Sequence, residues 1–385
     1  MFLEVDVLEM EEKMGDKFKI LIIDDSALMR SVESDIIGKD NRFEVVDTAP
    51  DGVTGLDLLI RNNGQYDLVL LDVNMPKMNG LEVLTRIQKY KLRCKVIMVS
   101  TLVKEGAHET ILALERGAVD FVLKPSAAKG ESRDEFEKKL LVAIAAALGC
   151  DDGVNENYKK VDSLKKQILA INDSNRNGLS RNRSSNNRDN VIVAIACSTG
   201  GPKTLKEIIP KLPKDIDVPI VLVQHMPMGF TKSLADRLDE LSEIDVTEAV
   251  DGEKLEKGHV YIAPGGKQLR IAKGIGSSHV IKLTDEEPRD GLRPCANIMY
   301  ESLADMGYEK ILCVVLTGMG ADGRAGIEKL SKTKETYTIA QDADTCVVYG
   351  MPRAIVSSGL ADEVLPLDAI AGSIIKNVGV LSDGR

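Results

Sequence analysis

The stretch that most constrains the fold of this chain is VIVAIACSTGG, at residues 191–201. Its first seven residues are apolar and mostly β-branched or small, which is typical of a strand buried on both faces of a parallel sheet. The run ends at Ser198, and after two glycines Pro202 opens a stretch with the apolar spacing of a helix. Ser198 is therefore predicted to lie at a sharp strand-to-helix turn, on the sheet edge where open α/β folds bind their ligands.

A serine at such a turn fits two kinds of chemistry. The backbone N–H groups of the glycine turn and of the helix N-terminus can face a negative charge. Ser198 could therefore be a nucleophile beside an oxyanion hole, as in acyl-transfer enzymes. The same turn could instead bind a phosphate or have only a structural role, and this stretch alone favours neither interpretation.

Composition and charge limit the classes of protein to consider. With 385 residues the chain can form two or more domains, and 43% hydrophobic with 29% charged residues is ordinary for a soluble globular protein. The formal net charge of −10 argues against nucleic acid as the main partner. The longest uninterrupted apolar run, residues 140–148, is too short to cross a bilayer, so we expect no membrane insertion.

The cysteines and the N-terminus indicate the compartment. The six cysteines have no metal-binding spacing and several lie inside apolar runs, so we expect them to be reduced, in a cytoplasmic protein. Residues 1–17 are acidic and lack the basic start of a signal peptide, and we interpret them as an N-terminal tail.

Residues 18–149 alternate between strand-like and helix-like runs, five of each. This alternation predicts a doubly wound α/β domain with a parallel sheet. The expected strands are residues 19–23, 43–46, 68–71, 96–99 and 119–123. The expected helices are residues 27–37, 53–60, 81–89, 108–115 and 134–148.

Polar side chains follow the strands of this domain where each strand ends: Asp24 and Asp25, Asp72, Ser100 and Lys124. The carboxyl ends of parallel strands meet at one sheet edge, so we expect these side chains to converge. Three close carboxylates repel one another unless a hard cation lies among them, and Mg²⁺ binds carboxylate oxygens, so the three aspartates are candidate Mg²⁺ ligands. One carboxylate beside the ion could attack a phosphoryl donor, with Ser100 and Lys124 holding the new phosphoryl oxygens. Any one of these residues could be a solvated loop residue, but the five together favour a site.

Four motifs carry these polar residues: the Asp24-Asp25 pair, DVNMPKMNG from Asp72, VSTL around Ser100 and DFVLKP ending at Pro125. Together they resemble the receiver domain of response regulators. The resemblance implies a flavodoxin-like (βα)5 fold, phosphorylation of Asp72 by a histidine kinase and a switch aromatic at Phe121.

Residues 150–189 differ in composition from the regions on both sides. Asn, Ser, Arg and Asp dominate residues 172–190, which predicts a flexible linker. Just before them, the apolar spacing over residues 161–171 is typical of a short amphipathic helix that packs on a domain or binds a partner.

Residues 190–385 are predicted to form a second α/β domain, doubly wound around a largely parallel sheet. Buried-strand patterns cover residues 191–197, 219–223, 259–262, 311–316 and 338–340, and an alternating strand is expected after His279. Helix-like stretches include residues 231–241 and 325–330.

If Ser198 is a nucleophile it needs a base, and the chain contains four histidines. Only His225 lies just past the carboxyl end of a buried strand, on the same predicted edge as Ser198. Asp322 is the only acid of the glycine-rich loop 317–323, after another buried strand, and could orient the imidazole. The order Ser198, His225, Asp322 differs from those of α/β-hydrolases, chymotrypsin and subtilisin. Cys197 is a rival nucleophile, but alternation along the strand points its side chain away from that of Ser198.

Five motifs mark this domain: STGGP at Ser198, QHMPMGFT at Gln224, YIAPGG at Tyr261, LTGMGADG at Leu316 and GMPR at Gly350. They resemble the chemotaxis protein-glutamate methylesterase family, and with the receiver motifs the resemblance covers about residues 18–375. It implies an enzyme that removes methyl esters from glutamyl residues of chemoreceptors and deamidates specific glutamines. It also implies that the receiver covers the active-site edge until Asp72 is phosphorylated.

The same resemblance implies roles for individual residues. Ser198 would be the nucleophile, His225 the base and Asp322 its orienting partner, and the hydrolase domain would need no cofactor. Thr199 and Met319 would line the site, with the backbone of Met319 as an oxyanion-hole candidate.

Two departures from the family pattern are notable. The usual GASTGG is ACSTGG here, and the family's RPSxD has Cys295 and Asn297 in place of its serine and aspartate. Because of Cys295 and Asn297, the resemblance does not predict which side chains of that loop contact the substrate.

The sequence is also compatible with two other functions. The chain could be a response regulator whose second domain binds without catalysis, although a DNA-binding output domain should be basic and contain a helix-turn-helix. It could also be a serine hydrolase for another ester or amide, because the STGG turn specifies chemistry and not the acyl group.

Overall fold

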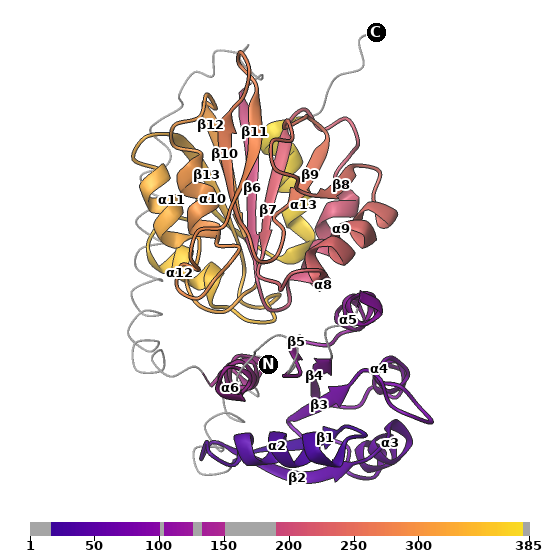
Figure 1. The fold of residues 1–385 in the computed structure, drawn as a ribbon. Helices are drawn as coiled ribbons and strands as arrows, with labels where there is room; N and C mark the ends of the chain where they lie inside the picture. The colour runs from indigo at the N-terminus through magenta and orange to yellow at the C-terminus, as the bar shows by residue number, and fades with distance from the viewer. Residues whose placement is uncertain (1–16, 101–103, 126–132, 151–189, 380–385) are drawn as a thin grey trace.

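The structure is a computed structural model that describes residues 17–100, 104–125, 133–150 and 190–379. The predicted tail and linker, including the predicted helix at 161–171, therefore lie almost entirely outside the described residues. The described residues form two α/β domains (Figure 1).

The N-terminal domain contains a five-stranded parallel sheet with the strand order β2-β1-β3-β4-β5. Its strands are β1 (Phe18–Ile23), β2 (Phe43–Ala49), β3 (Leu68–Asp72), β4 (Lys95–Ser100) and β5 (Asp120–Leu123). Its helices are α2 (Ala27–Ile37), α3 (Gly52–Arg61), α4 (Gly80–Lys89), α5 (Lys104–Glu115) and α6 (Arg133–Leu148). This order is that of the flavodoxin-like fold, so the predicted (βα)5 domain is confirmed.

Capping side chains fix where the first helices of this domain begin. The side chains of Ser26 and Asp51 accept hydrogen bonds from backbone N–H groups in the first turns of α2 and α3. Asn79 and Glu82 form a capping box at the start of α4. Because each helix starts soon after its strand, the polar residues between strand and helix stay at the carboxyl edge of the sheet.

The C-terminal domain contains a seven-stranded parallel sheet with the order β14-β13-β12-β6-β7-β9-β8, and an antiparallel β10–β11 pair. The strands are β6 (Val191–Cys197), β7 (Pro219–Gln224), β8 (Asp245–Glu248), β9 (His259–Ile262), β10 (Gln268–Lys273), β11 (His279–Thr284), β12 (Lys310–Val315), β13 (Glu335–Gln341) and β14 (Glu363–Leu365). The helices are α8 (Gly201–Ile208), η3 (Ile209–Lys211), α9 (Phe230–Leu241), α10 (Ala296–Ser302), α11 (Arg324–Leu330), α12 (Met351–Ser357) and α13 (Leu367–Val378).

Strand β6 is the strand from which this sheet winds in both directions. It pairs with β7 on one side and with β12 on the other. Its alternate side chains face two cores: Val193, Ile195 and Cys197 pack with α8, α9 and α13, whereas Ile192, Ala194 and Ala196 pack with α10, α11 and α12. Such a topological switch point is where doubly wound sheets bind ligands, and Ser198 follows it directly.

Three strands of the C-terminal domain, β8, β10 and β14, are not predicted by the sequence pattern. Strands β8 and β14 are the two edges of the large sheet, and β10 belongs to the separate hairpin. All three are short or carry charged side chains, so their hydrophobic pattern is weaker than that of the central strands. No helix among the described residues has the length and apolar composition that crossing a membrane requires.

The two domains contact each other through α5 and β5. Figure 1 shows α5, β5 and α6 on the side of the N-terminal domain that faces the C-terminal domain. Helix α5 packs on α8 and α9, and Phe121 of β5 stacks on Phe230 with ring centroids 4.7 Å apart. Glu115, at the end of α5, accepts hydrogen bonds from Arg237 Nε (2.9 Å) and Lys206 Nζ (3.3 Å).

Candidate active site and phosphoacceptor site

The turn after β6 places Ser198 at its corner. Gly200 has a φ of 80°, a conformation that favours glycine, and it precedes α8. A Cβ on Gly201 would lie 1.9 Å from the Gln224 amide oxygen, and a Cβ on Gly318 would lie 2.8 Å from the Ser198 Cβ. Glycine is therefore required on both sides of the serine, which explains the STGG turn and the glycine-rich loop after β12.

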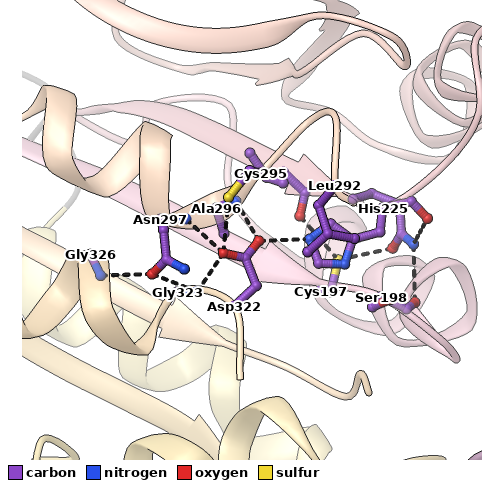
Figure 2. Close-up of polar contacts among 12 residues, drawn as sticks. Cys197, Ser198, His225, Leu292, Cys295, Ala296, Asn297, Asp322, Gly323 and Gly326 are labelled. Atoms are coloured by element: carbon purple, nitrogen blue, oxygen red, sulfur yellow. Dashed lines mark hydrogen bonds and ion pairs between the residues drawn. The ribbon is translucent and has the colours of Figure 1, made fainter. Parts of the chain in front are cut away.

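His225 and Asp322 form a buried pair beside this turn. The His225 Nε2 atom lies 2.8 Å from Asp322 Oδ2, and both side chains are at least nine-tenths buried. Figure 2 shows the imidazole between Asp322 and Ser198. Because Nε2 faces Asp322, Nδ1 is the ring nitrogen left for the serine. Among the described residues no hydrogen bond yet joins the Ser198 hydroxyl to the ring; such contacts often tighten only when substrate binds.

Asp322 is surrounded by hydrogen-bond donors. Four groups besides His225 donate to its carboxylate: Ala296 N–H (2.6 Å), Asn297 N–H (2.9 Å), Gly323 N–H (2.9 Å) and the Cys295 thiol (3.2 Å). Burial alone would raise the pKa of Asp322, but the hydrogen bond and charge of His225 and the backbone N–H groups of α10 lower this pKa to about 2. Asp322 is therefore held as a carboxylate.

The two residues that depart from the family's RPSxD pattern, Cys295 and Asn297, both lie around Asp322. Cys295 donates to its carboxylate, and the Asn297 side-chain oxygen accepts hydrogen bonds from the N–H groups of Gly323 and Gly326 (Figure 2). Asn297 thus ties the loop that carries Asp322 to the start of α10. The structure places both residues behind the acid and not against the turn of Ser198.

Gln224, at the end of β7, is a residue of the site that the sequence analysis did not single out. Its amide nitrogen donates to the backbone oxygens of Ser198 (3.0 Å) and His225 (3.2 Å), and its oxygen accepts from the Cys197 thiol (3.0 Å). It therefore fixes the nucleophile turn relative to the base. A glutamine at the end of an otherwise apolar strand was the signal. Burial raises the pKa of the fully buried Cys197 thiol, which makes it a poor rival nucleophile.

Thr199 and Met319 lie beside the serine. Their backbone N–H groups make no hydrogen bond within the described part of the chain, so both can face a developing oxyanion. Thr199, His225 and Met319 line a cavity of about 220 Å³ whose other wall comes from β5 and α6 of the N-terminal domain. The Thr199 hydroxyl donates a hydrogen bond of 2.5 Å to Asp120 of β5.

A second site lies at the carboxyl edge of the N-terminal sheet. Carboxylate oxygens of Asp24, Asp25 and Asp72 lie within 4.8 Å of one another, and Lys124 Nζ lies 2.7 Å from both Asp24 and Asp72. Ser100, at the end of β4, is fully buried. Burial raises the pKa of Asp72, and the Lys124 ammonium opposes that rise. Three carboxylates so close together are a donor set that fits Mg²⁺.

Glu33 is an unusual neighbour of this acidic site. It is fully buried on α2, and neither of its carboxyl oxygens has a hydrogen-bond partner among the described residues. Burial and the charge of Asp24 raise its pKa to about 8. This residue was not predicted from the sequence, although an acidic residue in helical register with the buried Ile36 and Ile37 was a visible signal.

Comparison with known proteins separates the chain into the same two parts. The response regulator receiver domain model matches residues 20–131, and the CheB methylesterase model matches residues 193–374. Two crystal structures of Thermotoga maritima CheB are similar to the separate parts. Its methylesterase catalytic domain is 45% identical, covering 48% of this chain and 97% of that chain with a TM-score of 0.47. Its response regulator domain is 39% identical, and the match covers 35% of this chain and 98% of that domain with a TM-score of 0.32.

Curated relatives match along nearly the whole chain. The protein-glutamate methylesterase/protein-glutamine glutaminase of Oceanobacillus iheyensis is 42% identical over 94% of this chain and 99% of its own length. The protein of the same name from Pyrococcus horikoshii is 39% identical over 96% of both chains. This chain therefore belongs to the protein-glutamate methylesterase/protein-glutamine glutaminase family, in which a response-regulator receiver domain precedes a methylesterase domain.

Proposed function

We propose that this protein is a phosphorylation-activated hydrolase that removes methyl esters from glutamyl residues of chemoreceptors and deamidates specific glutamines to glutamate. The observation that carries the proposal is the His225–Asp322 pair at 2.8 Å beside the Ser198 turn, in a chain whose relatives are named for both activities. Ser198, His225 and Asp322 are the proposed catalytic residues.

The geometry supports a two-step acyl transfer. The Ser198 hydroxyl attacks the carbonyl carbon of the γ-methyl ester while His225 Nδ1 accepts its proton, and Asp322 holds the imidazolium through Nε2. The intermediate collapses, the carbon–oxygen bond to the methoxy group breaks, and methanol leaves with the proton of His225. Water then attacks the acyl-serine while His225 takes a proton from it, and the bond between the acyl carbon and the serine oxygen breaks as His225 returns that proton to Ser198 and the glutamate forms.

The negative charge of each tetrahedral intermediate needs donors in place. The N–H groups of Thr199 and Met319, unpaired within the described chain, are the proposed oxyanion hole, from the residue after the nucleophile and from the glycine-rich loop. A glutamine side chain presents the same carbonyl with ammonia as the leaving group. The same residues therefore account for deamidation.

The receiver supplies the regulation in this proposal. Asp24, Asp25 and Asp72 would hold Mg²⁺, which neutralises charge as a chemotaxis histidine kinase transfers a phosphoryl group to Asp72. Lys124 and Ser100 would contact the phosphoryl oxygens. We place this activity in the cytoplasm, and the six free cysteines are in line with that compartment.

The proposal is tested by the release of methanol from methylated chemoreceptors. The full chain, phosphorylated by a small phosphodonor with Mg²⁺, should release methanol, and Ser198→Ala should not while keeping the circular dichroism spectrum of the wild type. Cys197→Ser should retain activity. Full activity in Ser198→Ala would end the proposal, and hydrolysis of other esters without release from receptors would favour a different substrate.

A further inference from the structure

The contact between the domains that lies closest to the catalytic residues is a single hydrogen bond. The Thr199 hydroxyl, one residue after the nucleophile, donates to Asp120 Oδ2 at 2.5 Å. The other carboxyl oxygen of Asp120 accepts from its own neighbour, the Phe121 N–H, at 2.8 Å. An acidic side chain of the receiver is therefore held with its carboxyl group at the active-site turn.

The carboxyl group of Asp120 borders the space that a substrate needs. Asp120, Thr199, His225 and Met319 all line the same cavity of about 220 Å³. The substrate must bring the end of a glutamyl side chain, a carbonyl with a second oxygen or nitrogen, to Ser198. Asp120 brings a carboxyl group on a side chain one methylene shorter, presented by the first residue of strand β5.

We propose that the Thr199 hydroxyl recognises an acyl oxygen of the glutamyl side chain, and that Asp120 occupies this position as a built-in analogue of the reaction product. This inference rests on the proposed function and names a recognition residue and its internal competitor. It differs from simple coverage of the active site, because it assigns the competition to one carboxyl group and one hydroxyl.

The surroundings of Asp120 support its role as an internal competitor at the nucleophile turn. Burial raises the pKa of this carboxyl, and the hydrogen bonds from the Thr199 hydroxyl and the Phe121 N–H oppose that rise. Two other contacts between the domains among the described residues, the Phe121–Phe230 stack and the ion pairs of Glu115, involve no residue of the proposed triad. They hold the receiver in place, whereas Asp120 bonds directly to the nucleophile turn.

The first experiment distinguishes a product analogue at Asp120 from a receiver domain that only blocks access to the active site. In the unphosphorylated full chain, Asp120→Leu keeps the bulk of the side chain but cannot accept the Thr199 hydrogen bond, and it should raise the rate of methanol release about tenfold. Asp120→Asn keeps an acceptor and an amide like that of the glutamine substrate, and it should retain most of the inhibition. Asp134→Leu makes the same change on the exposed first turn of α6 and should leave the rate unchanged.

The second experiment tests Thr199 in the phosphorylated full chain, where Asp120 no longer competes. Thr199→Val removes only the hydroxyl and should raise the KM for methylated receptor about tenfold, while Thr199→Ser should stay within about twofold of wild type. In the same phosphorylated state all three receiver variants should equal the wild-type rate, which also shows that they fold.

Two outcomes would overturn the inference. If Asp120→Leu is activated normally by phosphorylation but has the basal rate of wild type, the receiver acts only as a cover. If Thr199→Val leaves KM unchanged, the hydroxyl does not recognise the substrate. Either result would leave the proposed function intact, because methanol release by the phosphorylated wild type is measured in the same assay.

Discussion

Asp72 and Asp322 are both buried at or beyond the carboxyl ends of parallel strands, but their environments differ. Asp72 is 5% exposed and Asp322 is 7% exposed. Nevertheless the pKa of Asp72 is raised, by burial, whereas that of Asp322 is lowered to about 2. Burial is common to both carboxylates, so the difference comes from the donors around them.

The donors around the two aspartates suit two kinds of chemistry. Asp322 has permanent partners on the helix start that carries Ala296 and Asn297, and it faces His225, so its charge is satisfied at all times. Asp72 shares one ammonium group with Asp24. An orienting acid must remain a fixed anion, whereas a phosphoacceptor needs an environment that a cation and a phosphoryl group can complete.

The largest effect should follow from neutralising the satisfied carboxylate. Asp322→Asn keeps the shape of the side chain but loses its charge and places an NH₂ group among donors. We expect the rate of methanol release by the phosphorylated chain to fall by on the order of 10³-fold or more, because the imidazole loses its orienting anion. Phosphorylation of Asp72 should be unaffected. A rate within about tenfold of wild type would show that Asp322 is not part of the catalytic unit.

The corresponding change at the other aspartate should leave catalysis in place. Asp72→Asn should take up no phosphoryl group from a small phosphodonor, and it should keep the basal rate of hydrolysis while losing activation. Removing Mg²⁺ with a chelator should have the same consequence in the wild type, because the three carboxylates then lack their cation. Electrophoretic mobility on a phosphate-binding gel measures the phosphorylation. If Asp72→Asn is still phosphorylated, the phosphoacceptor is another residue.

The outcome for Ser198, His225 and Asp322 shows how far the sequence could predict the site. Each follows a strand of one parallel sheet, so the fold brings all three to one edge, and the apolar patterns of central strands are strong. The donors to Asp322 could not be predicted, because α10 reaches it through a long loop without a recognisable pattern.

The family resemblance implied that the receiver covers the active-site edge, but the residues that make the contact could not be predicted. The hydrogen bond between Thr199 and Asp120 depends on how two separate folds dock, and no periodicity in the sequence encodes that arrangement. The short edge strands β8 and β14 were missed for a different reason. They are buried on fewer sides than the central strands, so they lack a continuous apolar run.

The two regions should also respond to pH in opposite directions. The pKa of Glu33 is about 8 in the folded receiver and 4.5 unfolded, so its contribution to stability is complete below pH 4.5 and is lost as pH rises through 8. The pKa of Asp322 is about 2 folded and 3.8 unfolded, so its contribution is present above pH 3.8 and is lost as pH falls through 2. Hydrogen exchange at several pH values, read separately for each domain, measures both trends.

Replacing Glu33 isolates the receiver's share of this pH dependence. Glu33→Leu removes a buried carboxyl without hydrogen-bond partners among the described residues and should stabilise the receiver by about 1–3 kcal/mol at pH 8, with little gain at pH 4.5. Asp35→Leu, on the exposed side of the same helix, is the matched control and should not change the pH dependence. Equal stabilisation by Glu33→Leu at both pH values would mean that Glu33 does not titrate in this range.

The smallest effect should come from the ion pairs that connect the two regions. Glu115 is 6% exposed, but its partners Arg237 and Lys206 are 25% and 35% exposed, so solvent screens much of the attraction. Glu115→Gln should therefore raise the basal rate of methanol release only about two- to fivefold. Added salt should raise the basal rate of wild type more than that of the variant, because salt weakens the ion pairs but not the stack of Phe121 on Phe230. An increase as large as that of Asp120→Leu would mean that docking strength, and not the carboxyl group beside Thr199, sets the basal rate.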